Sequence, residues 1–214
     1  MMPQVSAFIL DFEKYKAEDL RGYLCCRNID SARFNNKQKI FSQFIRYFVL
    51  EEFYHISSPV FLNQHGKPYL ADNSVFFNIS HTQTKLIIAV ADQEIGADIE
   101  KLSARRNIIR IAQRYFTSLE NQWLAASDNL VKDFYTLWTL KEAQVKRDSL
   151  GIAKGLSGAN FSKINNSWLS NSYPDDFVTF SYDESIVSIC CKNIVAQEIN
   201  LFEIVDFKFK QIQL

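Results

Sequence analysis

Two charged side chains interrupt an apolar helical pattern in the segment WTLKEAQVK, residues 138–146. The apolar face of this predicted helix is formed, at helical spacing, by Leu130, Phe134, Leu137, Trp138 and Val145. At about 100° per residue, Lys141 falls within that face, Glu142 at its edge and Lys146 one turn further along. An unpaired carboxylate beside aromatic side chains is costly, so Glu142 needs a metal, a lysine or both. Lys146 stands in the favoured i,i+4 order for a pair with Glu142, so a plain surface ion pair is the alternative.

The segment ADIE, residues 97–100, places two carboxylates two residues apart in a strand-like stretch. Side chains at this spacing in a strand point to one face, so Asp98 and Glu100 project together and Ile99 is buried behind them. Like carboxylates this close repel each other unless a cation lies between them. Mg²⁺ takes oxygen ligands from one or two carboxylates together with phosphate oxygens. The segment is therefore interpreted either as part of a magnesium site or as a solvated edge of a sheet.

Two further segments carry polar groups at exposed positions. FNISH ends a predicted strand with Ser80 and His81, and GKP marks a turn formed by Gly66, Lys67 and Pro68. A Gly-Lys turn can offer backbone amides and one cation to an anion, although alone it is a weak signal. The sequence contains no G-x-x-x-x-G-K-[ST] loop, and no serine, histidine and aspartate set has the spacing of a hydrolase.

The elements that must position these residues alternate between strands and helices. Strands are predicted at 5–12, 75–80, 84–91, 94–100, 177–183, 185–191 and 198–207, and helices at 16–26, 34–54, 107–116, 117–126 and from Ser127 or Asp128 onward. The tight spacing of the strands at 75–80, 84–91 and 94–100 suggests that they pair antiparallel with one another. The segment TSLE, residues 117–120, has the pattern of a capping box. Segments 79–89 and 180–190 share a pattern of strand, polar turn and strand. This echo predicts an α+β fold of two pseudo-symmetric α/β halves, residues 1–95 and 96–214, whose antiparallel sheets and helices meet at a cleft.

Composition narrows the class of protein. The chain has 214 residues and a formal net charge of zero, which gives no support for a nucleic-acid or membrane partner. No segment approaches 18 consecutive apolar residues, and the N-terminal stretch lacks the features of a signal peptide. The four cysteines occur as two vicinal pairs without the C-x-x-C spacing of a zinc site. We therefore expect reduced thiols and a cytoplasmic protein.

The order of the motifs is more specific than any one of them. G66-K67-P68 is followed by F77-N78-I79-S80-H81, I95-G96-A97-D98-I99-E100, W138-x-x-K141-E142-A143-x-x-K146 and G155-L156. Over about residues 60–156 this order resembles the 4′-phosphopantetheinyl transferases of the Sfp type. The resemblance implies two pseudo-symmetric halves with coenzyme A between them. It also implies transfer of the 4′-phosphopantetheine arm to a serine of an acyl or peptidyl carrier protein, with release of adenosine 3′,5′-bisphosphate.

The resemblance also assigns roles residue by residue. It implies that Asp98, Glu100 and Glu142 hold Mg²⁺. Glu142, or a water that it holds, resembles the base that takes the serine proton, and Lys146 resembles the lysine that steadies the pyrophosphate charge. Contacts with coenzyme A are expected from Gly66, Lys67, Pro68, Ser80, His81 and Lys141. One chain supplies both sides of the cleft, so a monomer is expected. Residues 103–127 are the expected carrier-docking segment, in which Ile108, Ile109, Tyr115 and Phe116 either offer apolar contacts or pack in the core.

One position departs from the family pattern. Family members usually carry a basic residue early in the long first helix, where it reaches the 3′-phosphate of coenzyme A, and Ser42 stands there in this chain. Arg33 is the first candidate to replace it, because its planar fork suits phosphate. Arg27, Lys37 and Lys39 are the neighbouring alternatives.

Two other classes of function remain as alternatives. A binding module could keep the fold and lack the reaction, although the loss of a carboxylate that would indicate this is not seen. A metal-dependent phosphohydrolase could use the same three carboxylates.

Overall fold

A computed structural model describes residues 5–32, 34–64, 66–104, 107–149, 155–164, 167–174 and 176–213. The fold is α+β with several antiparallel sheets, as predicted. The elements up to residue 91 are β1 (Val5–Asp11), α1 (Ala17–Cys25), α2 (Lys37–Phe48), β2 (Phe61–Gln64), β3 (Lys67–Leu70), β4 (Phe76–His81) and β5 (Lys85–Ala91). The next are β6 (Ile95–Lys101), α3 (Ile108–Tyr115), α4 (Ser118–Ala125), α5 (Leu130–Asp148), β7 (Phe161–Ile164), β8 (Ser167–Ser170), β9 (Phe177–Tyr182) and β10 (Ser185–Cys191). The chain ends with β11 (Ile199–Val205) and β12 (Lys208–Ile212); short 3₁₀ segments lie at Phe12–Lys14 and Ala196–Glu198, and a π-helical segment at Val49–Phe53 continues α2.

The two halves share one strand plan. In the first half β5 lies between β1 and β4, and in the second half β10 lies between β6 and β9, with every pairing antiparallel. A hairpin, β4–β5 or β9–β10, therefore follows the helices in each half. These two hairpins contain the segments whose sequences echo each other, so the echo corresponds to equivalent positions in the fold.

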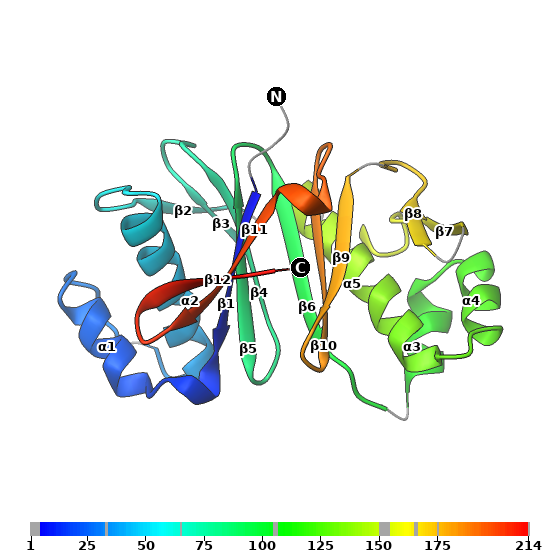
Figure 1. Cartoon of the computed structure of the whole chain (residues 1–214), viewed down its shortest axis with the longest axis horizontal. Coiled ribbons are helices and arrows are strands. Elements are labelled where there is room, and N and C mark those ends of the chain that lie inside the picture. The colour runs from blue at the N-terminus through cyan, green and yellow to red at the C-terminus, as the bar shows by residue number, and fades with distance from the viewer. Residues whose placement is uncertain are drawn as a thin grey trace.

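Helices cover the outer side of each half (Figure 1). α2 buries the predicted stripe of apolar side chains, including Phe41, Phe44 and Phe48, against Phe8 and Ile88 of the first sheet. Full burial of one such side chain contributes about 1.5–3 kcal/mol. In the second half α5 packs Leu137 and Leu140 into a separate cluster with α3, α4 and β7. None of the helices in the described part of the chain combines the length and apolar character of a membrane span.

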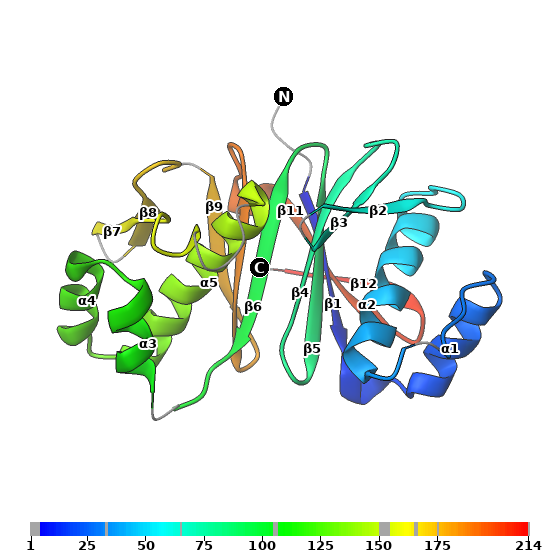
Figure 2. The ribbon, with the colours of Figure 1, turned by 180° about the vertical axis from the view of Figure 1, so that it is seen from behind.

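A third apolar cluster joins the two sheets. Ile9 and Ile87 of the first half meet Ile99 and Val187 of the second half in this shared core. The last two strands return to the first sheet, where β11 pairs in parallel with β1 and antiparallel with β12 (Figure 2). The boundary expected between residues 95 and 96 falls inside β6, after its first residue, while residues 199–212 pair within the sheet of the first half.

Several local expectations need correction. Lys67 and Pro68 were expected in a turn but lie in strand β3 of a β2–β3 hairpin. Gly66, directly before them, does have turn geometry, with φ of 89°. β6 pairs with β10, whereas adjacency in the sequence suggested β5. The N-cap of α5 is Asn129, whose side chain accepts from the amide of Lys132, and not Ser127 or Asp128. Strands β2, β3, β7, β8 and β12 were not predicted.

Candidate active site

Strand β6 presents different chemistry on its two faces. Ile95, Ala97 and Ile99 lie in the core between the two sheets. The alternation of a strand turns Gly96, Asp98 and Glu100 the other way, where α5 packs along β6. The predicted common face of Asp98 and Glu100, with Ile99 buried behind, is therefore confirmed.

Gly96 allows α5 to approach β6 closely. A Cβ atom at this position would lie 1.9 Å from the carbonyl oxygen of Ala143 and 2.5 Å from the amide nitrogen of Arg147. Only glycine leaves room for helix backbone at this distance. The close approach brings the last two turns of α5, which carry Glu142 and Lys146, beside Asp98.

Lys146, Asp98 and Ser80 form a compact polar cluster between the halves. The Nζ of Lys146 lies 2.6 Å from Oδ1 of Asp98 and 2.9 Å from Oγ of Ser80. The Ser80 hydroxyl also donates to the same Asp98 oxygen at 2.6 Å. Ser80 comes from β4 of the first half, so the cluster draws on both halves.

Glu142 is buried next to this cluster. Burial raises the pKa of its carboxyl to about 7; Lys146 opposes this rise and the nearby Asp98 adds to it. A carboxylate with a pKa near neutrality is suited to take a proton from a hydroxyl. Lys146 therefore forms its ion pair with Asp98 and acts on Glu142 through its charge, so the i,i+4 ion pair considered from the sequence is not the contact that forms.

The donor set fits a magnesium ion. Oδ2 of Asp98 is buried and has no hydrogen-bond partner, so it is available to a cation. Asp98 and Glu142 are close enough to repel each other, and a cation would relieve that repulsion. Within the described ranges no three histidine, cysteine or carboxylate side chains lie together in a way that could hold a metal ion, so a set of three ligands is not preassembled. The assignment of Asp98, Glu100 and Glu142 as ligands stays a prediction.

Asn78 is a site residue that the sequence reasoning missed. Its side-chain oxygen accepts a hydrogen bond of 3.0 Å from the amide of Ala97, one residue before Asp98. Asn78 and Ser80 share one face of β4, and both contact β6. The signal available in the sequence was a polar residue within the apolar run VFFNI, and the structure shows that this asparagine is buried. His81, by contrast, is exposed at the end of β4.

Lys141 does not join the cluster. Its side chain is fully buried, and its Nζ lies 2.9 Å from Oε2 of Glu120 on α4. The same ammonium group donates to the carbonyl oxygens of Leu156 and Ala159. These contacts all lie inside the second half, so the expected contact of Lys141 with coenzyme A is corrected to an internal ion pair.

The basic residues considered as contacts for the 3′-phosphate of coenzyme A differ in their surroundings. Arg27 pairs with Glu51 and Glu52. Lys37 donates to the carbonyl oxygen of Phe12 at 3.1 Å. Lys39 is exposed, and Arg33 lies outside the described residues.

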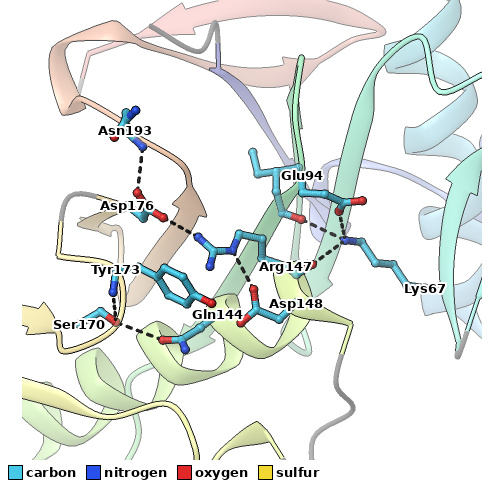
Figure 3. Close-up of polar contacts among 10 residues, drawn as sticks. Lys67, Glu94, Gln144, Arg147, Asp148, Ser170, Tyr173, Asp176 and Asn193 are labelled. Atoms are coloured by element: carbon cyan, nitrogen blue, oxygen red, sulfur yellow. Dashed lines mark hydrogen bonds and ion pairs between the residues drawn. The ribbon is translucent and has the colours of Figure 1, made fainter.

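Lys67 reaches the second half. Its Nζ lies within hydrogen-bond distance of Glu94, of the carbonyl oxygen of Ile95 and of the carbonyl oxygen of Arg147 (Figure 3). Beside it is a pocket of about 270 Å³ that residues of both halves line, among them Tyr69, Phe77, Glu94 and Ser149. A larger pocket of about 850 Å³ lies within the second half beside Trp168 and Lys163, and none of the residues predicted to bind metal or coenzyme A is among those that line it.

The chain is similar in sequence to known proteins over about half of its length. Residues 94–190 match the model of the 4′-phosphopantetheinyl transferase superfamily. The chain is 35% identical over 109 residues to the 4′-phosphopantetheinyl transferase gsp of Aneurinibacillus migulanus, which covers 50% of this chain and 41% of that protein. It is 33% identical over 115 residues to the 4′-phosphopantetheinyl transferase Sfp of Bacillus subtilis, covering 52% and 50%. It is 35% identical over 96 residues to the 4′-phosphopantetheinyl transferase HetI of a Nostoc species, covering 42% and 40%.

The matched region contains β6 and α5, which carry Asp98, Glu142 and Lys146. Residues 94–190 are thus similar to the 4′-phosphopantetheinyl transferase superfamily, which confirms the resemblance inferred from the motifs. The chain matches about half, or less, of the length of these curated relatives.

Proposed function

We propose that this protein transfers the 4′-phosphopantetheine arm of coenzyme A to a serine of an acyl or peptidyl carrier protein. The reaction releases adenosine 3′,5′-bisphosphate and depends on Mg²⁺. The observation that carries the proposal is the cluster of Ser80, Asp98, Glu142 and Lys146 between the halves, most of it within the segment that matches the superfamily. We further propose that the enzyme acts as a monomer, because one chain supplies both sides of the cluster. We also propose that it is cytoplasmic, in line with the reduced thiols expected from its cysteines.

Glu142 is proposed as the base. With its pKa raised to about 7 by burial, a substantial fraction of this carboxyl is ionised at neutral pH and can accept a proton. The proton comes from the hydroxyl group of the carrier serine as its oxygen forms a bond to the β-phosphorus of coenzyme A. The bond from that phosphorus to the bridging oxygen breaks, and the electron pair leaves with the phosphate of adenosine 3′,5′-bisphosphate.

Lys146 and Ser80 are proposed to bind the pyrophosphate. Their polar atoms lie 2.9 Å apart and both face the same oxygen of Asp98, so they can receive one phosphate group together. A lysine ammonium placed where negative charge develops stabilises the leaving group without reorganisation. Asp98 orients both groups before substrate binds.

Asp98, Glu142 and Glu100 are the residues proposed to hold Mg²⁺. The unpartnered buried oxygen of Asp98 and the nearby Glu142 supply the oxygen ligands that this ion prefers. When bound, the ion would offset negative charge on the pyrophosphate.

The rest of the substrates would lie along the boundary between the halves. Gly66, Pro68, His81 and the backbone of Lys67 are proposed to line the coenzyme A site, next to the pocket that both halves form. Carrier docking is proposed on residues 103–127, where Ile109 of α3 is 55% exposed and Leu119 of α4 is 49% exposed. Ile108 and Phe116 of the same segment are buried and belong to the core.

Mass spectrometry of carrier proteins tests the proposal. Apo acyl carrier protein and an apo peptidyl carrier domain are each incubated with the protein, coenzyme A and Mg²⁺. A 4′-phosphopantetheine adduct on the carrier serine, absent with the Asp98→Asn variant, is the expected result. Release of free 4′-phosphopantetheine without an adduct would identify a hydrolase, and unchanged coenzyme A with both carriers would leave a binding module.

A further inference from the structure

Lys67 directs its hydrogen-bond donors to the residue before β6, to the first residue of β6 and to the last turn of α5. Its Nζ lies 2.9 Å from Oε2 of Glu94, 3.4 Å from the carbonyl oxygen of Ile95 and 3.3 Å from the carbonyl oxygen of Arg147. An ammonium group has three donors, so these three acceptors account for them. The side chain is only 16% exposed, which limits competition from water.

The two carbonyl groups belong to the places where α5 and β6 meet. Arg147 is in the last turn of α5, one residue after Lys146, and Ile95 begins β6 directly before Gly96. The final carbonyl groups of a helix lack partners within it and carry partial negative charge, so a cation there is stabilising. α5 stops at Ser149, whose φ of 55° is left-handed, so Lys67 caps the end of this helix from the other half.

The side chain of Arg147 holds the same turn from the opposite side. Its guanidinium pairs with Asp148 at 2.9 Å and with Asp176 at 2.7 Å, and Asp176 in turn accepts from the amide of Asn193 (Figure 3). The turn that carries Lys146 is thus tied to the second half through a side chain and to the first half through a backbone carbonyl.

Two other side chains of the first half also contact β6. Asn78 of the first half binds the amide of Ala97, and Ser80 binds Asp98. Lys67 contacts Ile95, so three side chains of the first half contact β6 within residues 95–98. Of these three side chains, that of Lys67 also contacts the backbone of α5. Its contact with the carbonyl oxygen of Arg147 lies one residue after Lys146, whose ammonium group contacts Ser80.

We propose that Lys67 is a positioning residue that joins the end of α5 to the first half of the molecule, and so holds Glu142 and Lys146 beside Asp98 and Ser80 before any substrate binds. The catalytic part of this proposal rests on the proposed function, while the structural part concerns the free protein. It differs from a direct contact of Lys67 with coenzyme A, which would matter only in the complex.

Amide hydrogen exchange of the protein without coenzyme A tests the structural part. In Lys67→Met we expect amides of residues 144–148 and of the start of β6 to exchange at least about tenfold faster, because hydrogen bonds to a charged donor are lost. The matched control is Lys101→Met at the other end of β6, where Lys101 forms an exposed pair with Glu184 and no change in these amides is expected. Glu94→Gln removes the carboxylate charge and leaves both carbonyl contacts, so it should change exchange less than Lys67→Met does. Unchanged exchange in Lys67→Met would overturn the proposal.

Kinetics test the catalytic part. We expect Lys67→Met to lower kcat about ten- to a hundredfold, the scale of a small misplacement of reacting groups, with KM for coenzyme A changed about twofold or less. Lys67→Arg, which retains charge and donors, should recover most of kcat and of the exchange protection, and Lys67→Gln is measured alongside as a milder loss. A rise in KM alone, with exchange unaltered, would overturn positioning in favour of a direct contact with coenzyme A. If the wild type lacks transfer activity the proposed function fails, while faster exchange in Lys67→Met still establishes the joint between the halves.

Discussion

Two lysines of α5, five residues apart, form ion pairs of different character. Lys141 and Glu120 lie 2.9 Å apart, and both side chains have no exposed surface. Lys146 and Asp98 lie 2.6 Å apart, with side chains 23% and 5% exposed, at the boundary between the halves. The two pairs look alike in sequence, since each lysine belongs to the same WxxKEAxxK segment.

The difference lies in how fully the acceptors are used. Glu120 accepts from Lys141 and from the backbone amides of Thr117 and Phe161, so it closes α4 and β7 onto α5. Burial lowers the pKa of Lys141, and Glu120 opposes this by stabilising the charged form. In the other pair, Oδ2 of Asp98 is left without a partner. A saturated pair stabilises the fold, whereas a pair with an open oxygen can receive a ligand.

The largest effect is expected from breaking the enclosed pair. Lys141→Met leaves the carboxylate of Glu120 buried without its cation, which should lower the free energy of unfolding by about 3–5 kcal/mol. Urea denaturation measures it. The matched control is Lys163→Met, whose pair with Asp133 on the same helix is about one-fifth exposed, and which should cost about 1 kcal/mol or less. Equal losses in the two variants would contradict the distinction between the pairs.

Substitutions in the open site, which is Asp98 with its unpartnered oxygen and the neighbouring Glu142 and Lys146, should lower the rate of transfer and leave the stability of the fold unchanged. Glu142→Gln keeps the shape of the side chain and removes its basicity, so kcat should fall about a hundredfold or more, the usual scale for a general base. Steady-state kinetics with an apo carrier protein measure it, and KM for coenzyme A should change less. Glu184→Gln, a carboxylate 77% exposed in the same half, is the control and should leave kcat unchanged. An effect confined to KM would move Glu142 from chemistry to binding.

Gly96 tests whether the contact between α5 and β6 sets the geometry of the open site. In Gly96→Ala the new Cβ meets the backbone of Ala143, so the helix must shift, at a cost of about 1–3 kcal/mol in stability. We also expect kcat to fall in the protein that remains folded, measured below its unfolding temperature. Gly22→Ala in α1 is the control, because nothing lies within 4 Å of the added Cβ and helix propensity favours alanine. A Gly96→Ala variant with normal kcat would show that the site tolerates a displaced helix.

The smallest effect concerns exposed apolar side chains. Ile108 is 4% exposed and Ile109 is 55% exposed on α3, so the same contrast between enclosed and open groups holds there. Ile109→Ser should raise KM for the carrier by about fivefold, since loss of one peripheral interface contact costs about 1 kcal/mol. KM for coenzyme A should not change. Val60→Ser, at a position 62% exposed in the first half, is the control, and equal changes in both variants would remove α3 from the docking surface.

Features with a short-range physical cause were readable in the sequence. The two-residue period of a strand placed Asp98 and Glu100 opposite Ile99, and the structure has this arrangement. The capping box at Thr117 and Glu120 is present because both partners lie within one helical turn. The apolar stripe of α2 follows from helical spacing alone, although the helix begins at Lys37 and not at Phe34.

The tertiary structure decided which charged residue faces which partner. The helical pattern placed Lys141 on the apolar side, but only the position of α4 shows that Glu120 meets it. Sequence adjacency suggested that β6 would pair with β5, whereas β10, some ninety residues later, takes that place. The contacts of Lys67 with Ile95 and Arg147 likewise join residues 28 and 80 positions apart. Local periodicity fixes the direction of a side chain, whereas its partner depends on the packing of distant segments, and the positions of Glu142 and Lys146 beside Asp98 depend on both.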